Sequence, residues 1–101
     1  MGHKSRQKPK KLAEKLTRIR NELGVSQNGM IRKLGLTDEL GQSHISMFEH
    51  GEREPTLIVL LRYARVAGVS TDILIDDELD LPKRLPNRIQ ARGKKKRADD
   101  L

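Results

Sequence analysis

The sequence predicts an all-α fold, a compact domain of five short helices with a basic segment at each end. Apolar residues recur at helical spacing, and Leu12, Leu16, Ile19 and Leu23 fall on one helix face. Glycines and hydroxyl residues divide the chain at the expected ends and beginnings of the helices. No stretch shows the sustained alternation of apolar and polar residues that is typical of a half-buried strand.

The first two helices are predicted from this apolar pattern and from the residues that flank it. We expect the first helix over residues 10–23, before a glycine that is a natural C-terminal stop. Ser26 is expected to cap a second helix that ends at Gly35. Residues 35–41, GLTDELG, lie between two glycines and are expected to form a loop.

The remaining three helices are shorter or more apolar. A third is expected over about residues 42–50, ended by Gly51, and a fourth follows Thr56 as its cap. A fifth, capped by Ser70, is expected to be short. The core-facing stripe of the fourth helix is expected to contain Leu57, Leu60, Leu61, Ala64 and Ala67.

The fourth helix carries a second apolar stripe, formed by Val59, Tyr63 and Val66. One interpretation is a surface for dimerisation. The other is that the following segment, DELDLP, folds back and covers the stripe with Leu79 and Leu81. We slightly favour the second, because a helix that is apolar on two faces is usually buried within its own chain first.

Composition and charge restrict the class of protein. The chain has 101 residues and no cysteine, which excludes disulfides and thiolate chemistry. Its net charge of +7 is uneven: residues 1–20 carry eight lysines and arginines against one glutamate, and residues 83–97 carry eight and no acid. The body between them is acidic. Basic ends are typical of binding to polyanions such as nucleic acid, although solvated tails that only confer solubility explain them equally well.

The chain is therefore expected to divide into three segments. Residues 1–9 would form a flexible basic arm, residues 10–81 the folded domain, and residues 82–101 a basic, disordered tail. No apolar run is long enough to span a membrane, and the N-terminus lacks the apolar region of a signal peptide. A cytoplasmic, nucleoid-associated protein is expected.

Five segments together resemble one known family. They are IRNELGVSQ (19–27), KLG (33–35), ISMFEHGEREPT (45–56), LLRYARVAGVS (60–70) and LI (74–75). Their order, glycine stops and caps are similar to those of the Cro/C1-type helix-turn-helix domains of the XRE family. The resemblance implies a lambda-repressor-like fold of five helices that binds double-stranded DNA.

The resemblance also implies roles for residues of the third helix. Ile45 and Phe48 would anchor this recognition helix in the core, which explains why one of only two aromatic residues stands before Glu-His-Gly. The opposite face would read base edges in the major groove, since a glutamine amide can bond adenine bidentately and a methionine can touch a thymine methyl. The implied base-reading residues are Gln42, Ser43, Ser46 and Met47.

Further roles follow from the same resemblance. Arg20 and Glu49 would form an ion pair that holds the fold and does not read bases. For His44, a partly packed surface histidine is at least as good an explanation as a DNA contact. The residues implied to touch the DNA backbone are Gln27, His44, His50, Arg53, Lys8 and Lys10.

The sequence departs from the family pattern in the turn between the second and third helices. This turn is longer by roughly four residues than the three to four that are usual. It also carries Asp38 and Glu39, whose carboxylates would repel phosphates. Either the loop projects away from the DNA, or the reading helix is rearranged.

The leading hypothesis for function is a sequence-specific DNA-binding transcriptional regulator, expected to be a homodimer on an inverted repeat. The alternative is an antitoxin-like module that binds a partner protein and represses its own operon. An enzyme is not expected, because no catalytic set stands out and His44 and His50, six residues apart, do not share a helix face as i, i+4 metal ligands would. No metal, cofactor, membrane or small-molecule substrate is expected.

Overall fold

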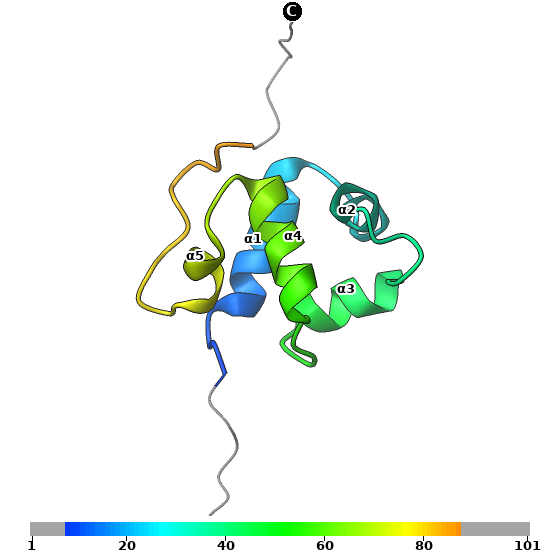
Figure 1. Cartoon of the computed structure of the whole chain (residues 1–101), viewed down its shortest axis with the longest axis horizontal. Helices are drawn as coiled ribbons and strands as arrows, with labels where there is room; N and C mark the ends of the chain where they lie inside the picture. Colours follow the sequence, from blue (N-terminus) through cyan, green and yellow to red (C-terminus); the bar gives the residue numbers. More distant parts are fainter. Residues whose placement is uncertain (1–7, 88–101) are drawn as a thin grey trace, which may run out of the picture.

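The computed structural model describes residues 8–87, and this part of the chain contains five α-helices and no strand (Figure 1). The all-α prediction is confirmed. The first helix begins two residues later than expected, and the 35–41 segment is a loop with a single turn. The helices are α1 (Leu12–Leu23), α2 (Gln27–Leu34), α3 (Gln42–Glu49), α4 (Leu57–Ala67) and α5 (Thr71–Ile75).

Local signals in the sequence set the helix boundaries. The Ser26 hydroxyl accepts the N–H of Gly29 at 2.9 Å and begins α2, and the Thr56 hydroxyl accepts the N–H of Val59 at 3.3 Å and begins α4. Helix α2 ends at Gly35, whose φ of 72° lies in the left-handed region that glycine adopts without a steric penalty. These caps were all predicted, because they depend on neighbouring residues alone.

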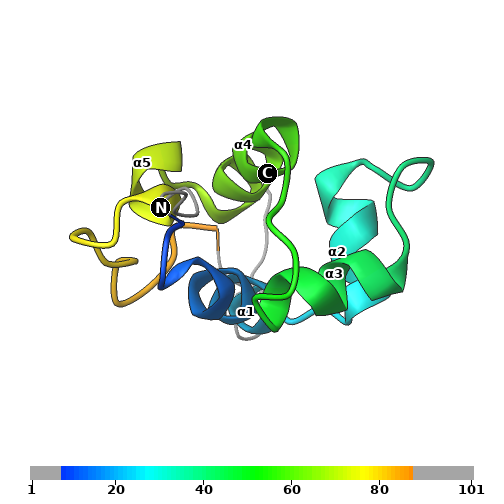
Figure 2. The ribbon, with the colours of Figure 1, turned by 90° about the horizontal axis from the view of Figure 1, so that it is seen from below.

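The five helices enclose one hydrophobic core. Helix α1 lies at its centre and contacts α3, α4 and α5, while α2 packs on α3 and α4. Seen from below, α1 and α3 lie along one side of the domain, and α4 and α5 lie along the other (Figure 2). The largest side chains that are fully buried are Tyr63, Leu16, Ile19, Met30, Leu34, Ile45, Leu74 and Leu85.

Helix α4 is rotated relative to the prediction. Leu57 is 80% exposed, so its assignment to the core stripe was wrong, whereas Val59 and Tyr63 of the second stripe are buried. The reason is that α4 is apolar around most of its circumference, so the sequence pattern alone does not fix which face is inward. Leu81 is buried, but it lines a pocket with residues of α1, and Leu79 is 41% exposed, so the expected cover of the second α4 stripe by Leu79 is wrong.

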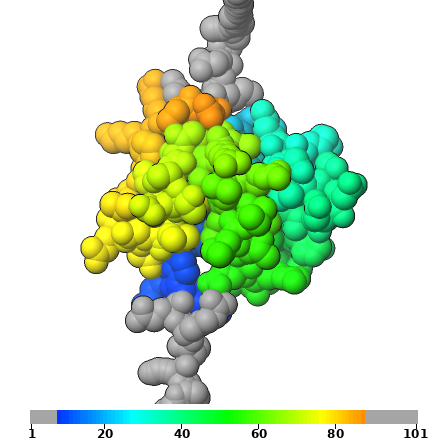
Figure 3. All heavy atoms as spheres, in the orientation of Figure 1, coloured from blue at the N-terminus to red at the C-terminus, as the bar shows by residue number. Residues whose placement is uncertain are grey.

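A C-terminal strap, residues 81–87, extends the folded part beyond the expected boundary at residue 81. Leu85 is fully buried, and its N–H donates to the Glu22 carboxylate. The Arg18 guanidinium donates to two backbone carbonyls, those of Pro82 and Lys83. In Figure 3 the strap, in orange, lies against the body of the domain. The sequence did not predict this contact, because Leu81 and Leu85 are a weak apolar signal within a basic segment.

Two charged side chains fasten α5 and the following turn to α1. The Asp77 carboxylate accepts the N–H groups of Lys10 and Lys11 at 2.8 and 3.0 Å, and these hydrogen bonds lower the pKa of Asp77. Lys15 is only 5% exposed, and its ammonium donates to three backbone carbonyls. Among the described helices none has the length and apolarity to cross a bilayer.

Candidate nucleic-acid interface

Helix α3 presents one polar face to solvent. Ile45 and Phe48 are buried against α1 and α2 and hold the helix on the body. At about 100° per residue, the side chains that point away from these two fall within roughly 140° of the helix circumference. This sector, the α3 face, consists of Gln42, Ser43, Ser46, Met47 and His50, all at least partly exposed. It includes all four residues that the resemblance implies for base reading.

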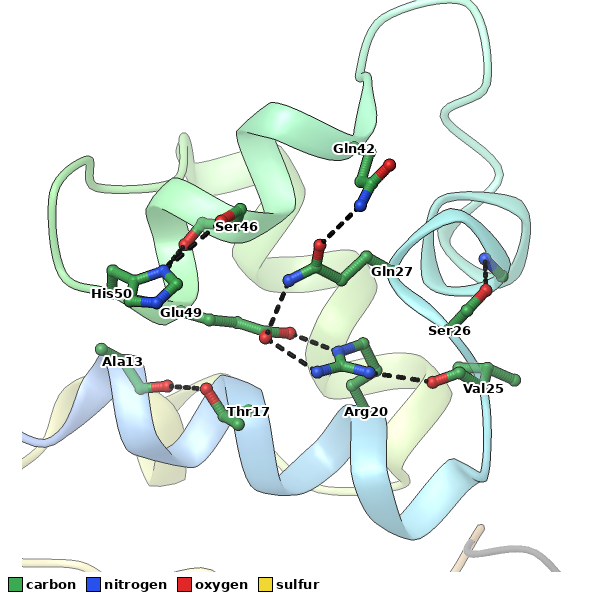
Figure 4. Close-up of polar contacts among 11 residues, drawn as sticks. Ala13, Thr17, Arg20, Val25, Ser26, Gln27, Gln42, Ser46, Glu49 and His50 are labelled. Atoms are coloured by element: carbon green, nitrogen blue, oxygen red, sulfur yellow. Dashed lines mark hydrogen bonds and ion pairs between the residues drawn. The ribbon is translucent and has the colours of Figure 1, made fainter.

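An ion pair ties the end of α3 to α1. The Arg20 guanidinium donates to both carboxylate oxygens of Glu49, with Nε–Oε2 at 2.6 Å and Nη2–Oε1 at 3.0 Å (Figure 4). A third nitrogen, Nη1, donates to the Val25 carbonyl at 3.1 Å. The Glu49 side chain is only 5% exposed, and its hydrogen bond raises the pKa of Arg20. Removal of either partner would leave a buried charge unpaired.

Two glutamine side chains continue this ion pair to the α3 face. Gln27, the first residue of α2, donates from Nε2 to Glu49 Oε1 at 3.3 Å. Gln42, the first residue of α3, donates from Nε2 to Gln27 Oε1 at 3.2 Å. Figure 4 shows the four side chains in one chain of contacts that reaches from α1 to the start of α3. Both ends of the Gln27 amide therefore form hydrogen bonds with other side chains of the protein, which the sequence did not predict.

His44 and His50 lie on different sides of α3. His44 lies on the side of α3 away from the α3 face, and its Nδ1 accepts the N–H of Gly41 at 3.0 Å. It therefore caps the start of α3. His50 lies on the α3 face, where its Nδ1 is 2.7 Å from the Ser46 carbonyl. Since a carbonyl only accepts, Nδ1 of His50 carries a proton.

The long loop between α2 and α3 is anchored to the body of the domain near α4. Leu36 is buried, and the Arg62 guanidinium donates to the Leu34 carbonyl at 2.7 Å, which holds the end of α2. Glu39 lines a pocket with Arg62 and His44, close to α4. At this position the Glu39 carboxylate lies in the same pocket as His44, which is outside the α3 face. Asp38 of the same loop is exposed.

Three basic residues gather beside the turn that follows α3. Lys8, Lys10 and Arg53 line one shallow surface hollow of about 280 Å³. All three side chains belong to exposed residues. Lys8 and Lys10 come from the start of the chain and Arg53 from the turn between α3 and α4, so only the fold brings them together. Glu52 and Glu54 line the same hollow, so the net charge of its lining is only +1.

The sequence also missed the two polar groups that fasten α5 and the following turn to α1. Asp77 is 66 residues from the Lys11 N–H that it accepts, and no local pattern connects them. The one available signal for Lys15 was its place at the edge of the apolar stripe of α1. Among residues 8–87, no cluster of histidine, aspartate and glutamate is arranged to hold a metal ion.

Comparison with known proteins agrees with this geometry. A family model described as helix-turn-helix (HTH_3) matches residues 16–74, which is more than half of the chain and includes α2, the loop and α3. No curated protein matches the chain, and no solved structure matches it. Members of this family are DNA-binding regulators. The chain therefore belongs to the Cro/C1-type helix-turn-helix family.

Proposed function

We propose that the protein is a sequence-specific transcriptional regulator that inserts α3 into the major groove. The observation that carries this proposal is the α3 face, an exposed polar sector on a helix whose other side is anchored in the core. An α-helix fits the major groove, where each base pair shows a distinct pattern of donors and acceptors. With no further domain among the described residues, repression by occluding a promoter is the simplest mode of action.

The roles along the interface are assigned by position. Gln42, Ser43, Ser46 and Met47 read base edges, with Gln42 suited to adenine because an amide offers one donor and one acceptor. Phosphates are bound by His50 at the end of α3 and by the exposed basic side chains of Lys8, Lys10 and Arg53. Gln27 has one amide hydrogen beyond the contact with Glu49, and the N-terminus of α2 beside it favours an anion.

A second copy of the chain is the partner that we propose for the α4 patch, which consists of Leu57, Ile58 and the adjoining pocket of about 450 Å³. Leu57 and Ile58 are the two most exposed large apolar side chains of the described part. The patch offers an apolar projection next to a hollow, which is what a two-fold interface needs, because the same surface serves both subunits. Its charges balance, with two acids and two arginines at the pocket: Glu39, Glu54, Arg53 and Arg62.

The proposed function is tested by selecting binding sites from a random duplex library at about 150 mM salt, where nonspecific binding is weak. Enrichment of an inverted repeat with half-sites about one helical turn apart supports a dimeric reader. The variant Gln42→Ala should relax the preference at one base position of each half-site. If binding fades uniformly with salt and no sequence is enriched, specific reading is refuted.

The proposed dimer has its own test. Leu57→Glu should leave the fold intact, because Leu57 is exposed, and should convert a dimer into a monomer in sedimentation equilibrium. A wild-type protein that is already monomeric at tens of micromolar would refute the second copy as the occupant. The α4 patch would then be a surface for another protein, as in the antitoxin-like alternative.

A further inference from the structure

We propose that Glu49 determines which base Gln42 prefers, by fixing the orientation of two amide groups between them. This inference rests on the proposed function, and it assigns a positioning role to a residue that does not itself touch DNA. The four side chains Arg20, Glu49, Gln27 and Gln42 form an uninterrupted row of hydrogen bonds from α1 to the α3 face. We call this row the relay.

The orientation begins at Glu49, because an ionised carboxylate can only accept hydrogen bonds. Arg20 donates to both of its oxygens. Whatever faces Glu49 must therefore be a donor, so Gln27 turns its Nε2 toward Oε1 of Glu49. The two ends of an amide differ only by hydrogen bonding, and the surrounding network decides which end points where.

The orientation then passes to Gln42. Since the amide nitrogen of Gln27 faces Glu49, its oxygen faces Gln42. Gln42 must therefore donate an N–H to that oxygen. One N–H of Gln42 is used in this contact. Its Oε1 and its second N–H remain for the DNA. One acceptor beside one donor matches the N6 amino group and N7 of adenine.

The reversed relay would select a different base. If Gln27 were turned over, its nitrogen would donate to Oε1 of Gln42, and Gln42 would keep two N–H groups for the DNA. Two donors match guanine, which shows two acceptors, N7 and O6, in the major groove. The carboxylate of Glu49 excludes this arrangement. The relay therefore favours adenine over guanine at the position that Gln42 reads.

The substitution Glu49→Gln tests this proposal. A glutamine at position 49 can place either its oxygen or its nitrogen against Gln27, so the orientation is no longer imposed. The preference for adenine over guanine, which a bidentate contact makes on the order of 10- to 100-fold, should fall to within about 3-fold. The measurement is a competition titration at 150 mM salt with two duplexes that differ only at the base pair that Gln42→Ala affects.

Two further variants separate orientation from stability. Glu22→Gln removes the charge of another carboxylate that pairs with an arginine of α1, Arg18, but it lies outside the relay. It should keep the adenine preference of the wild type. Gln27→Met breaks the relay without removing the ion pair, and it should relax the preference as Glu49→Gln does. Gln27→Met removes the amide through which Glu49 reaches Gln42, so an unchanged preference in this variant overturns the proposal even if Glu49→Gln fails to fold.

The possible results distinguish an orienting role of Glu49 from a purely structural one. Relaxed preference in both relay variants, with no further change when they are combined, supports the proposal. Weaker binding to both duplexes in equal proportion, with the preference unchanged, overturns it and leaves Glu49 with a structural role alone. A wild-type preference for guanine at this position overturns it as well. A wild-type protein with no base preference at any position would instead refute the proposed function.

Discussion

The buried ammonium of Lys15 is predicted to be a main support of the domain. Its Nζ donates to the carbonyls of Ile73, Asp76 and Leu79 at 2.7, 3.1 and 2.8 Å, and so it closes the end of α5 and the turn that follows. A hydrogen bond to a charged group contributes about 1.5–3 kcal/mol. Asp76 and Leu79 are exposed residues whose carbonyls can regain water, whereas Ile73 is half-buried.

From these contacts we expect Lys15→Met to lower the free energy of unfolding by about 3 kcal/mol. This value counts the hydrogen bond to Ile73 in full and those to Asp76 and Leu79 in part. Methionine keeps most of the length of the side chain and removes only the charge and the donors. For a domain of this size the change corresponds to a fall in Tm of about 12–24 °C. The assay is urea unfolding at pH 7, followed by circular dichroism at 222 nm.

Lys11→Met is the matched control. The Lys11 ammonium lies 3.8 Å from the Asp80 carboxylate, and both side chains are largely exposed. Exposed ion pairs of this kind contribute about 0–1 kcal/mol, so the control should unfold within that range of the wild type. If the two variants differ by less than about 1 kcal/mol, the three carbonyl contacts do not stabilise the fold and the reasoning from the geometry is refuted.

Four other predictions concern stability. The Tyr63 hydroxyl is buried without a hydrogen-bond partner among the described residues, so Tyr63→Phe should raise stability by about 1 kcal/mol in urea unfolding. Burial also raises the pKa of Tyr63, the single tyrosine, so stability should be lost as pH rises above about 10, and absorbance at 295 nm should show ionisation only on unfolding. The pKa of Asp77 is lowered, so its contribution should be present above pH 4 and disappear as pH falls further; Asp77→Asn should flatten the acid limb of the stability curve. Gly68 has φ of 80°, and a Cβ there would lie 3.0 Å from atoms of the strap, so Gly68→Ala should cost about 2 kcal/mol in thermal unfolding.

The number and limits of the helices could be predicted because each depends on neighbouring residues. Ser26 and Thr56 cap the helices that they precede, and Gly35 ends α2, as their positions in the sequence indicate. The orientation of α4 could not be predicted in this way. Its apolar residues surround the helix, and only the shape of the core decides that Tyr63 is inside and Leu57 outside.

The candidate site was predictable to a similar degree. The resemblance indicated which residues of α3 lie on the exposed face, because helical periodicity and two buried anchors determine that face. It did not indicate the link through Gln27, since the contact with Glu49 joins residues 22 positions apart and the one with Gln42 joins residues 15 apart. Nor did it indicate that His44 caps α3, because the loop before it has no counterpart in the family pattern.

Glu49 has two functions in the relay, and any substitution at position 49 affects both of them. Its carboxylate is the buried partner of Arg20, so the fold requires a negative charge there. The same charge fixes the orientation of Gln27 and thus of Gln42. Ser43, Ser46 and Met47 have no such link to a buried charge among the described contacts. Ser43 is exposed, so we expect Ser43→Asn to change base preference with a change in unfolding free energy below about 0.5 kcal/mol, as is usual for exposed positions. A change of preference through Glu49 will be accompanied by a loss of stability.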